Sequence, residues 1–309
     1  MEELTCYFNG QYMKESEVRI ALWDSGLIEG GVYDVSRSYN HVPFFWKEHI
    51  DRLFSSARCI HLDTGQSPEE VYDIYLEVFK RNERLLDPED DFRIIYRVTP
   101  GVMPRPWVPP PKPTVIIDCA YLSPIYETMA KFYREGVHLV VVSTRAIPPQ
   151  CLDPKIKHTN RLCNNSADFE AKMIDPKAWA LMLDINGRVA EGPRFNCFVV
   201  RDGKLLTPRL DNILSGVTRA TLLRLAKEIG IDSVETDLYV YDFYTADEIF
   251  VTATSFTIYP VSKFNERELA KPIPGPITQQ LLSAFSKLVG FDIVQRVVSY
   301  AQVKAKATR

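Results

Sequence analysis

MLDINGRVAEGPRFNCFVVRDGKLL, residues Met182 to Leu206, places two turn signals between runs of apolar residues. Asn186-Gly187 and Asp202-Gly203 are dipeptides that tolerate the positive φ angles of a tight hairpin turn. Tyr7 to Met13 repeats the pattern around Asn9-Gly10. We therefore predict antiparallel hairpins in both halves of the chain.

Helical patterns stand between the predicted strands. Ser67-Pro68-Glu69-Glu70 is a capping box with proline at the first helical position. A second amphipathic run begins near Thr218 and stops at Gly230, a residue type that commonly follows a helix end. Residues 100–113 are rich in proline and are predicted as an ordered loop without helix. Helices mixed with a majority of hairpins predict an α+β fold.

The length of 309 residues favours two domains. We place a smaller N-terminal α/β domain at residues 1–128, an interdomain linker at 129–136 and a larger C-terminal domain at 137–309. A formal net charge of −3 without a basic cluster argues against a nucleic-acid partner. Six dispersed cysteines and five dispersed histidines predict no metal site and a reduced, cytoplasmic setting.

The amino terminus has neither the basic nor the apolar region of a signal peptide. No apolar run reaches the roughly 18 residues of a membrane span. We therefore predict a soluble globular protein without a membrane partner.

Lys157 lies in DPKIKHTNRLCNN, residues 153–165. A lysine amine attacks a carbonyl compound only when burial or nearby cations lower its pKa. Lys155, His158 and Arg161 are close in sequence. A solvated lysine is the alternative interpretation, and composition alone favours it.

Two further segments fit pyridoxal phosphate, a cofactor that binds lysine. Its ring nitrogen needs a facing carboxylate, and Glu191 opens EGPRFN, although an exposed loop acid would look the same. Leu214 to Arg219 (LSGVTR) leads into the predicted helix, whose unpaired N–H groups could bind a phosphate. An ordinary capped helix is the alternative there. Thr252 to Ser255 form a further turn that is rich in hydroxyl groups.

In chain order, several segments together resemble the fold-type IV, or class IV, family of pyridoxal-phosphate enzymes. These segments are GGVYDVSRSY, EHIDRLFSSA, IKHTNRL, GRVAEGPRFNCFVV, ILSGVTR and DEIFVTATS. The family includes branched-chain and D-amino-acid aminotransferases, (R)-selective amine transaminases and aminodeoxychorismate lyases. The resemblance covers about Tyr7 to Val289. It implies two domains, a β-barrel-like core with flanking helices in the larger one, and a homodimer.

The resemblance also implies roles for single residues. Lys157 corresponds to the lysine that holds pyridoxal 5'-phosphate as an internal aldimine and moves the proton between substrate and cofactor. Glu191 corresponds to the acid at the ring nitrogen, and Arg52 to the arginine that binds the phosphate. The remaining cofactor positions, which cradle the phosphate or pack on the ring, are Leu214, Gly216, Val217, Thr218 and Thr254.

By the same resemblance, Tyr33 and Val35 line the substrate pocket. Arg37 is either a pocket residue or a structural arginine in an ion pair. Arg105 corresponds to a loop arginine that binds a substrate carboxylate, with an exposed loop arginine as the alternative. Trp107 and Phe195 complete the predicted substrate set.

Some positions depart from the family pattern. Trp107 stands where D-amino-acid enzymes have histidine, and residues 193–195 replace small hydroxyl residues. A tyrosine of branched-chain enzymes near Arg161 is absent, and IKHTNRL is closer to the lyase segment. The roles of Arg161 and Arg194 stay open.

We expect an aminotransferase that moves an amino group between a hydrophobic amino acid (branched-chain or D-amino acid) or an amine and a 2-oxo acid. An aminodeoxychorismate-type lyase is the alternative. A non-catalytic protein that binds pyridoxal phosphate is a third hypothesis.

Overall fold

A computed structural model describes residues 2–307, with side chains described as far as residue 302. It contains two compact units. The N-terminal unit comprises Met1–Ser123 together with Ile156–Asn160, and the C-terminal unit comprises Pro124–Lys155 together with Arg161–Arg309. Each unit combines helices with a sheet, which confirms the α+β fold.

The first unit ends at Ser123 instead of residue 128, and the division differs from the predicted one in two further places. Residues 129–136, expected as a linker, belong to helix α3 (Tyr126–Glu135) and its C-cap Gly136. The segment around Lys157, expected in the C-terminal domain, belongs to the N-terminal unit. Both differences arise because contacts between residues far apart in sequence define a unit.

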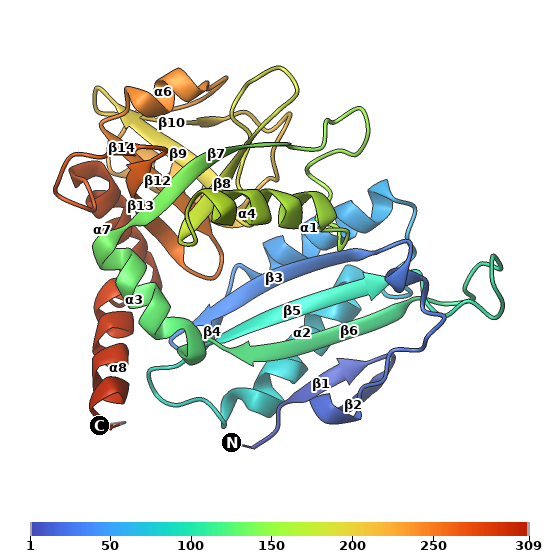
Figure 1. The fold of residues 1–309 in the computed structure, drawn as a ribbon. Helices are drawn as coiled ribbons and strands as arrows, with labels where there is room; N and C mark the ends of the chain where they lie inside the picture. Colours follow the sequence, from blue (N-terminus) through green and yellow to red (C-terminus); the bar gives the residue numbers. More distant parts are fainter. Residues whose placement is uncertain (1, 308–309) are drawn as a thin grey trace. The chain divides into compact units, whose positions relative to one another are not determined.

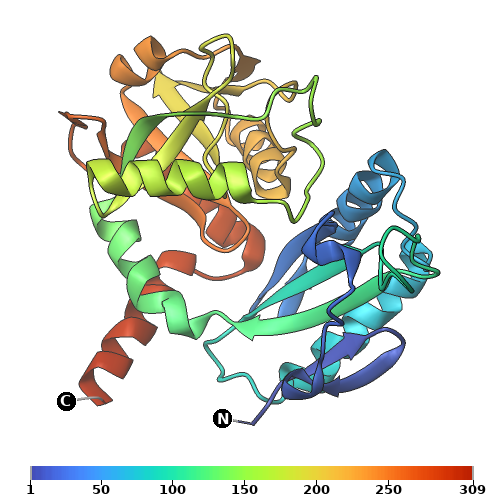
Figure 2. The ribbon, with the colours of Figure 1, turned by 45° about the vertical axis from the view of Figure 1, so that its right-hand side comes forward.

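The N-terminal unit contains a six-stranded antiparallel sheet (Figure 1). In spatial order its strands are β2 (Gln11–Lys14), β1 (Thr5–Phe8), β6 (Thr114–Tyr121), β5 (Phe92–Thr99), β3 (Val32–Tyr39) and β4 (Val42–Phe44). Helices α1 (Trp46–Cys59) and α2 (Pro68–Glu83) cover one face, as Figures 1 and 2 both show. Two 3-10 turns, η1 (Glu15–Glu17) and η2 (Ser25–Leu27), follow β2.

Strand β3 sends alternate side chains to the two faces of this sheet. Asp34 and Ser36 point toward the helices, where Asp34 bonds to His49 of α1 and Ser36 to Tyr75 of α2. Tyr33 and the other odd-numbered positions of β3 therefore point to the face that these two helices leave uncovered. The predicted pocket residues Tyr33 and Val35 lie on that second face.

The C-terminal unit contains an eight-stranded mixed sheet. Its order is β11 (Ser233–Thr236), β10 (Lys204–Pro208), β9 (Asn196–Arg201), β12 (Glu248–Ala253), β13 (Thr257–Phe264), β7 (Val137–Arg145) and β8 (Ala178–Leu183), with β14 (Arg267–Glu268) paired to β13. The β10–β11, β13–β7 and β7–β8 pairs are parallel, and the others are antiparallel.

Helices flank this sheet. Besides α3 they are α4 (Leu162–Ile174), α5 (Val217–Glu228), α6 (Val240–Tyr244), α7 (Pro276–Val289) and α8 (Ile293–Ala307), and the 3-10 turn η3 (Ser123–Ile125) precedes α3. Helix α4 packs Ala167 and Ala171 on β7 and β8, because small side chains let the helix approach closely. Gly230 follows α5 with a φ of 78°, as predicted.

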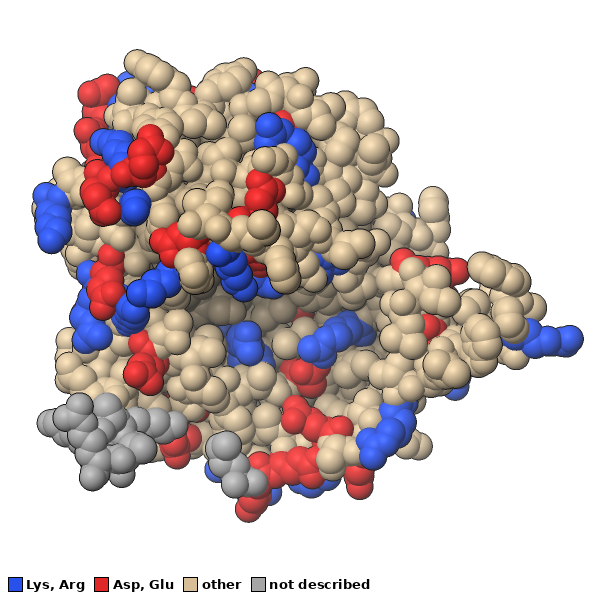
Figure 3. All heavy atoms as spheres, viewed as in Figure 1, with Lys and Arg blue, Asp and Glu red and all other residues tan. Residues whose placement is uncertain are grey.

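Charges of both signs are interspersed over the face of the molecule shown in Figure 3. This distribution agrees with the balanced composition and shows no basic field on that face. Within residues 2–307, none of the helices combines the length and the apolar character that crossing a membrane requires.

Candidate active site

Lys157 is held by both of its backbone polar groups within the N-terminal unit. Its N–H donates to Ser56 Oγ at 3.0 Å, and its carbonyl accepts from the Tyr33 N–H at 3.0 Å. The Thr159 N–H donates to the Gly31 carbonyl at 2.8 Å. Residues 157–159 are thus attached to the start of β3 and to α1. These hydrogen bonds hold the backbone of Lys157 in place.

The ammonium of Lys157 lies over an aromatic ring. Its Nζ is 4.7 Å from the centroid of Tyr33, a cation–π distance. Tyr33 lies directly opposite Arg97 of β5, and Arg97 forms an ion pair with Asp118 of β6. Val35 lies opposite Ile95. Beside Lys157 the sheet therefore presents the apolar side chains of Val35 and Ile95, the Tyr33 ring and the ion pair between Arg97 and Asp118.

A buried cluster lies on the opposite face of β3. Arg52 donates from Nε to Asp34 Oδ2 at 2.8 Å and from Nη2 to Oδ1 at 2.7 Å, and His49 Nδ1 is 2.8 Å from the same Oδ1. Burial acts to raise the pKa of Asp34, but Arg52 and His49 outweigh it and hold that pKa well below its usual range. Burial lowers the pKa of His49. The predicted phosphate arginine is thus a cation whose orientation an ionised aspartate determines.

Three other predicted substrate residues belong to the N-terminal unit, and their surroundings differ from those of Tyr33 and Val35. Arg37 is buried, with Nη2 3.7 Å from Asp91 Oδ2 and its guanidinium over the Tyr39 ring. The ion pair with Asp91 fits the structural interpretation of Arg37, and its role in the pocket stays a prediction. Arg105 and Trp107 lie on the proline-rich loop, where both are exposed, Trp107 by 88%.

Glu191 of the C-terminal unit lies beside Asn196. The Asn196 amide nitrogen donates to Glu191 Oε2 at 2.8 Å and to the Leu214 carbonyl at 3.1 Å. The backbone of Glu191 is fixed too, because its carbonyl accepts from the Met182 N–H at 3.1 Å. Two of the predicted cofactor residues, Glu191 and Leu214, are therefore joined through one amide.

The turn after Glu191 is tight. The Gly192 N–H donates to the Phe195 carbonyl at 3.0 Å, and the Phe195 ring lies so close to Gly192 that a Cβ there would collide with it. Arg161 donates to the Pro193 carbonyl from the start of α4. Arg194 pairs with Asp168 of α4. Both arginines thus have structural partners around this turn.

The N-terminus of α5 suits a phosphate. Gly216 is its N-cap and has no side chain to satisfy the first-turn N–H groups, which include those of Val217 and Thr218. A Cβ at Gly216 would collide with Asn196 Oδ1, so the chain needs glycine there. Arg219 points elsewhere, to the Pro208 carbonyl and Glu235 at 2.7 Å each. The donors at this helix start fit the phosphate of the predicted cofactor.

Thr254 lies at the tip of the β12–β13 hairpin. Thr252 Oγ1 donates to the Thr257 carbonyl at 2.5 Å and closes the hairpin, and Thr257 has a φ of 65°. Thr252 also pairs with Asn196 of β9 in the sheet. The register therefore brings the tip that carries Thr254 to the same end of the sheet as Glu191 and Asn196.

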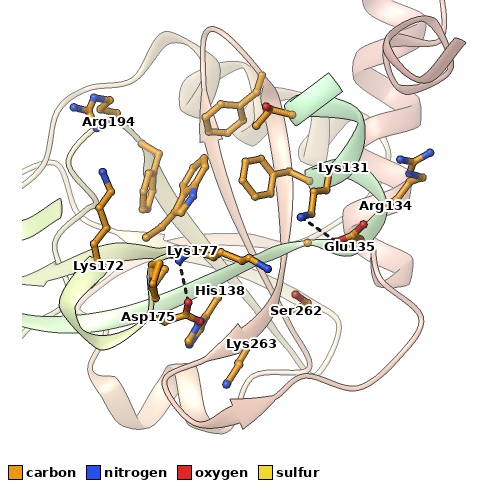
Figure 4. A pocket seen from close by; sticks show the side chains of 18 of the residues that line it. Lys131, Arg134, Glu135, His138, Lys172, Asp175, Lys177, Arg194, Ser262 and Lys263 are labelled. Atoms are coloured by element: carbon orange, nitrogen blue, oxygen red, sulfur yellow. Dashed lines mark hydrogen bonds and ion pairs between the residues drawn. The ribbon is translucent and has the colours of Figure 1, made fainter. Parts of the chain in front are cut away.

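Phe195 belongs to an aromatic cluster. Its ring centroid is 5.5 Å from that of Trp179, which also contacts Phe256 and Tyr259. The cluster borders an open cavity of about 1040 Å³ between α3, β7, β13 and the end of α4 (Figure 4). Of the predicted site residues, Phe195 alone is among the lining residues that the structure describes. Several charges at the rim form pairs, including His138 with Asp175 at 2.7 Å.

Three residues that the sequence analysis did not single out support the predicted ones. Asp34 orients Arg52, Ser56 anchors Lys157, and Asn196 contacts Glu191. Each stands inside a segment that carries the family resemblance. The sequence did contain one indication of the contact between Asp34 and Arg52. Asp34 alternates with Tyr33 along β3 and is buried, and a buried carboxylate requires a cationic partner.

Comparison with known proteins gives a consistent result. The model of the family described as amino-transferase class IV matches residues 31–264. A Methanocaldococcus jannaschii protein with the provisional name of branched-chain-amino-acid aminotransferase is 35% identical over 91% of this chain and 95% of its own length. The D-alanine aminotransferase of Bacillus licheniformis is 30% identical over 91% of this chain and 96% of its own.

Solved structures agree. The branched-chain aminotransferase of Thermoproteus uzoniensis, determined with norvaline, is 27% identical, covers 96% of this chain and 98% of its own, and superposes with a TM-score of 0.81. These names do not favour the lyase alternative. The chain belongs to the class IV aminotransferase family and is a pyridoxal-phosphate-dependent transaminase.

Proposed function

We propose that Lys157 binds pyridoxal 5'-phosphate covalently and that the chain uses it to transfer amino groups from a hydrophobic amino acid to a 2-oxo acid. The observation that carries this proposal is the fixed backbone of Lys157, with its ammonium 4.7 Å above Tyr33. A surface lysine needs no such attachment. Glu191 would face the ring nitrogen and Leu214 would pack on the ring.

The phosphate would be bound by two kinds of donor. Arg52 supplies a guanidinium that Asp34 orients, and the start of α5 supplies the N–H groups of Val217 and Thr218 with the Thr218 hydroxyl. Thr254 is a further proposed ligand. A charged side chain combined with a helix N-terminus is a common way to bind a phosphate.

Bound pyridoxal phosphate supplies an aldehyde that condenses with amines and a protonated ring that withdraws electrons. The Lys157 amine would take the proton from the substrate α-carbon and return it later in the cycle. The Glu191 carboxylate would keep the ring nitrogen protonated. The neighbouring Asn196 would hold the Glu191 side chain, and Ser56 would hold the backbone of Lys157.

The proposed donor is a hydrophobic amino acid, branched-chain or D-configured, or an amine. Tyr33 and Val35 support this, since both lie on the sheet face that carries the Lys157 ammonium. Arg97 on the same face is neutralised by Asp118, so it does not oppose an apolar side chain. The names of the relatives, which include branched-chain and D-alanine aminotransferases, point to the same substrates. Arg105 is the proposed contact for the substrate carboxylate.

We further propose that the protein is a cytoplasmic homodimer. Two loops of the N-terminal unit, joined by the Met103 N–H to the Trp23 carbonyl at 2.9 Å, expose a set of large apolar side chains. This set is Leu22, Trp23, Leu27, Ile28, Val102, Trp107 and Val108. A patch of this kind is typical of an interface, and a second copy would cover it. All six cysteines are free thiols, which supports a reducing compartment.

A half-reaction panel tests the function. Protein loaded with pyridoxal phosphate is mixed with single amino donors (L-leucine, L-valine, D-alanine and an (R)-amine) in the absence of an acceptor. The visible band of the bound cofactor is expected to disappear with the hydrophobic donors and to return when a 2-oxo acid is added. A band that no donor changes would contradict the proposal, and pyruvate release from aminodeoxychorismate would favour the lyase.

A further inference from the structure

Asn196 contacts two of the segments proposed to hold the cofactor. Its Nδ2 carries two hydrogens, and the two acceptors within reach are Glu191 Oε2 at 2.8 Å and the Leu214 carbonyl at 3.1 Å. Neither an ionised carboxylate nor a carbonyl can donate, so the amide must turn its nitrogen toward them. Its oxygen then faces Gly216, the N-cap of α5. With 5% of its surface exposed, the side chain has no alternative partner in water.

The two acceptors belong to different parts of the proposed cofactor site. Glu191 follows β8 and is assigned to the ring nitrogen. Leu214 precedes Gly216 by two residues and leads into the helix start that is assigned to the phosphate. We propose that Asn196 is a positioning residue that fixes the Glu191 carboxylate relative to the N-terminus of α5. This inference rests on the proposed function, because a rigid cofactor must meet both groups at one spacing.

The physical reason is the mobility of a glutamate side chain. Glu191 is half-buried, and its carboxylate can rotate unless a partner selects one orientation. The backbone of Asn196 is held in place, because it is part of β9 and pairs with Thr252 of β12. A donor of fixed position therefore selects the orientation of the acid. A hydrogen bond to a charged group stabilises enough to change cofactor affinity by about tenfold or more.

The test uses the substitution Asn196→Asp, which keeps the size of the side chain and replaces its NH2 group by oxygen. Two quantities are measured on cofactor-free protein: the Kd for pyridoxal 5'-phosphate, by equilibrium dialysis well below the melting temperature, and the melting temperature itself. We expect the Kd to rise about tenfold or more. Asn265→Asp is the matched control, since its Nδ2 donates to Tyr244 Oη at 3.0 Å in the same unit. The control should leave the Kd within about twofold.

A double variant separates positioning from simple stability. Glu191→Gln combined with Asn196→Asp exchanges donor and acceptor, so the hydrogen bond between the two side chains can form again in the reverse direction. The melting temperature should recover relative to Asn196→Asp, whereas the Kd should stay weak because the acid at position 191 is gone. If the double variant also regained wild-type affinity, packing and not the oriented acid would explain the effect, and the inference would be wrong.

Two outcomes distinguish this inference from the proposed function. Asn196→Asp that folds and binds pyridoxal phosphate as tightly as the wild type overturns the role of Asn196 alone. A wild-type protein without affinity for pyridoxal phosphate overturns the proposed function itself. Asn196→Ser, whose hydroxyl is too short to reach both acceptors, provides the same comparison if Asn196→Asp does not fold.

Discussion

Asp34 and Arg52 form a buried bidentate ion pair, with donor–acceptor distances of 2.8 and 2.7 Å. Asp34 is the residue next to Tyr33 on β3, so one strand supplies both the ring beneath the Lys157 ammonium and the carboxylate that orients Arg52. His49 joins the pair through Nδ1. The proposed phosphate arginine therefore depends on a residue that does not itself touch the cofactor in our proposal.

Asp34→Asn should destabilise the protein and weaken its affinity for pyridoxal phosphate. Arg52 would remain in its buried position with only a neutral partner, and the loss of one member of a buried pair costs about 3 kcal/mol or more. The free energy of unfolding is measured by urea denaturation of the cofactor-free protein. Glu77→Gln is the control, because its pair with Arg81 on α2 is 2.8 Å long but exposed, and it should change stability by less than about 0.5 kcal/mol. Equal effects of the two substitutions would show that the Asp34 pair is unimportant.

His49 and Asp34 should make the protein sensitive to acid. Both have a pKa lowered in the folded chain, His49 mainly by burial and Asp34 by Arg52 and His49 against the opposing effect of burial. In the unfolded chain they titrate near their ordinary values of about 6.5 and 3.9. Below those values the unfolded chain binds protons that the folded chain does not, so stability falls as the pH falls.

The measurement is the free energy of unfolding at several pH values between about 7.5 and 3. The histidine contribution should be lost first, as the pH falls below about 6.5, and the aspartate contribution only below about pH 3.9. His49→Gln keeps a donor for Asp34 and should flatten the upper part of the curve. A curve of unchanged slope in that variant would argue against a neutral His49.

Lys157→Ala should abolish transamination and the visible band of the bound cofactor, since no other amine is proposed to bind the aldehyde. The hydrogen bonds that hold residue 157 use backbone atoms, so the melting temperature should change little. Lys155→Ala is the control two residues away, where Lys155 is exposed and pairs with Asp153 at 3.1 Å. It should retain both the band and the activity. A visible band that survives dialysis in Lys157→Ala would refute the assignment.

Ile28→Asp should weaken self-association. Ile28 is 70% exposed within the apolar patch of the N-terminal unit, and a charge in a buried interface would be left without a partner. Light scattering coupled to gel filtration would show a shift from dimer to monomer at micromolar concentration. Tyr241→Asp, at an equally exposed position on α6, should leave the mass unchanged. A wild-type monomer would contradict the homodimer directly.

Features set by a few neighbouring residues could be predicted from the sequence. Asn9-Gly10 and Asp202-Gly203 both adopt positive φ angles, and Ser67 caps α2 through the Glu70 N–H. Asn186-Gly187 was predicted as a similar tight turn, but only Gly187 of this pair has a positive φ angle. Asp184 Oδ1 accepts from the N–H groups of Asn186 and Arg188, so an aspartate side chain organises that turn.

Helix α3 was predicted as a linker although its pattern was visible. Tyr126, Met129, Ala130 and Tyr133 are its buried residues, at the spacing of one helical face. Mixed polarity in the flanking residues masked that spacing. The C-terminal helix α8 was missed in the same way, with Ile293 and Val297 buried four residues apart.

The candidate residues of the site came from the family resemblance, whereas their supporting contacts could not be predicted. The contact of Ser56 with Lys157 joins residues 101 positions apart, and local patterns carry no information about such a pairing. The same holds for Asn196 and Leu214, which meet only because β9 and the start of α5 are neighbours in the folded unit. Local patterns did not indicate the partners of Arg37 and Phe195 either, which are Asp91 and Trp179, and their roles in the substrate pocket stay predictions.

The five residues Ile156–Asn160 belong to the N-terminal unit, although the chain on both sides of them belongs to the C-terminal unit. A polypeptide that begins at Pro124 would keep Lys157 but lose the Tyr33 N–H and Ser56 hydroxyl that hold it. Chimaeras spliced at a single boundary between two family members would therefore mix the lysine of one parent with the anchoring groups of the other. Recombination that preserves activity must carry these five residues together with the first 123.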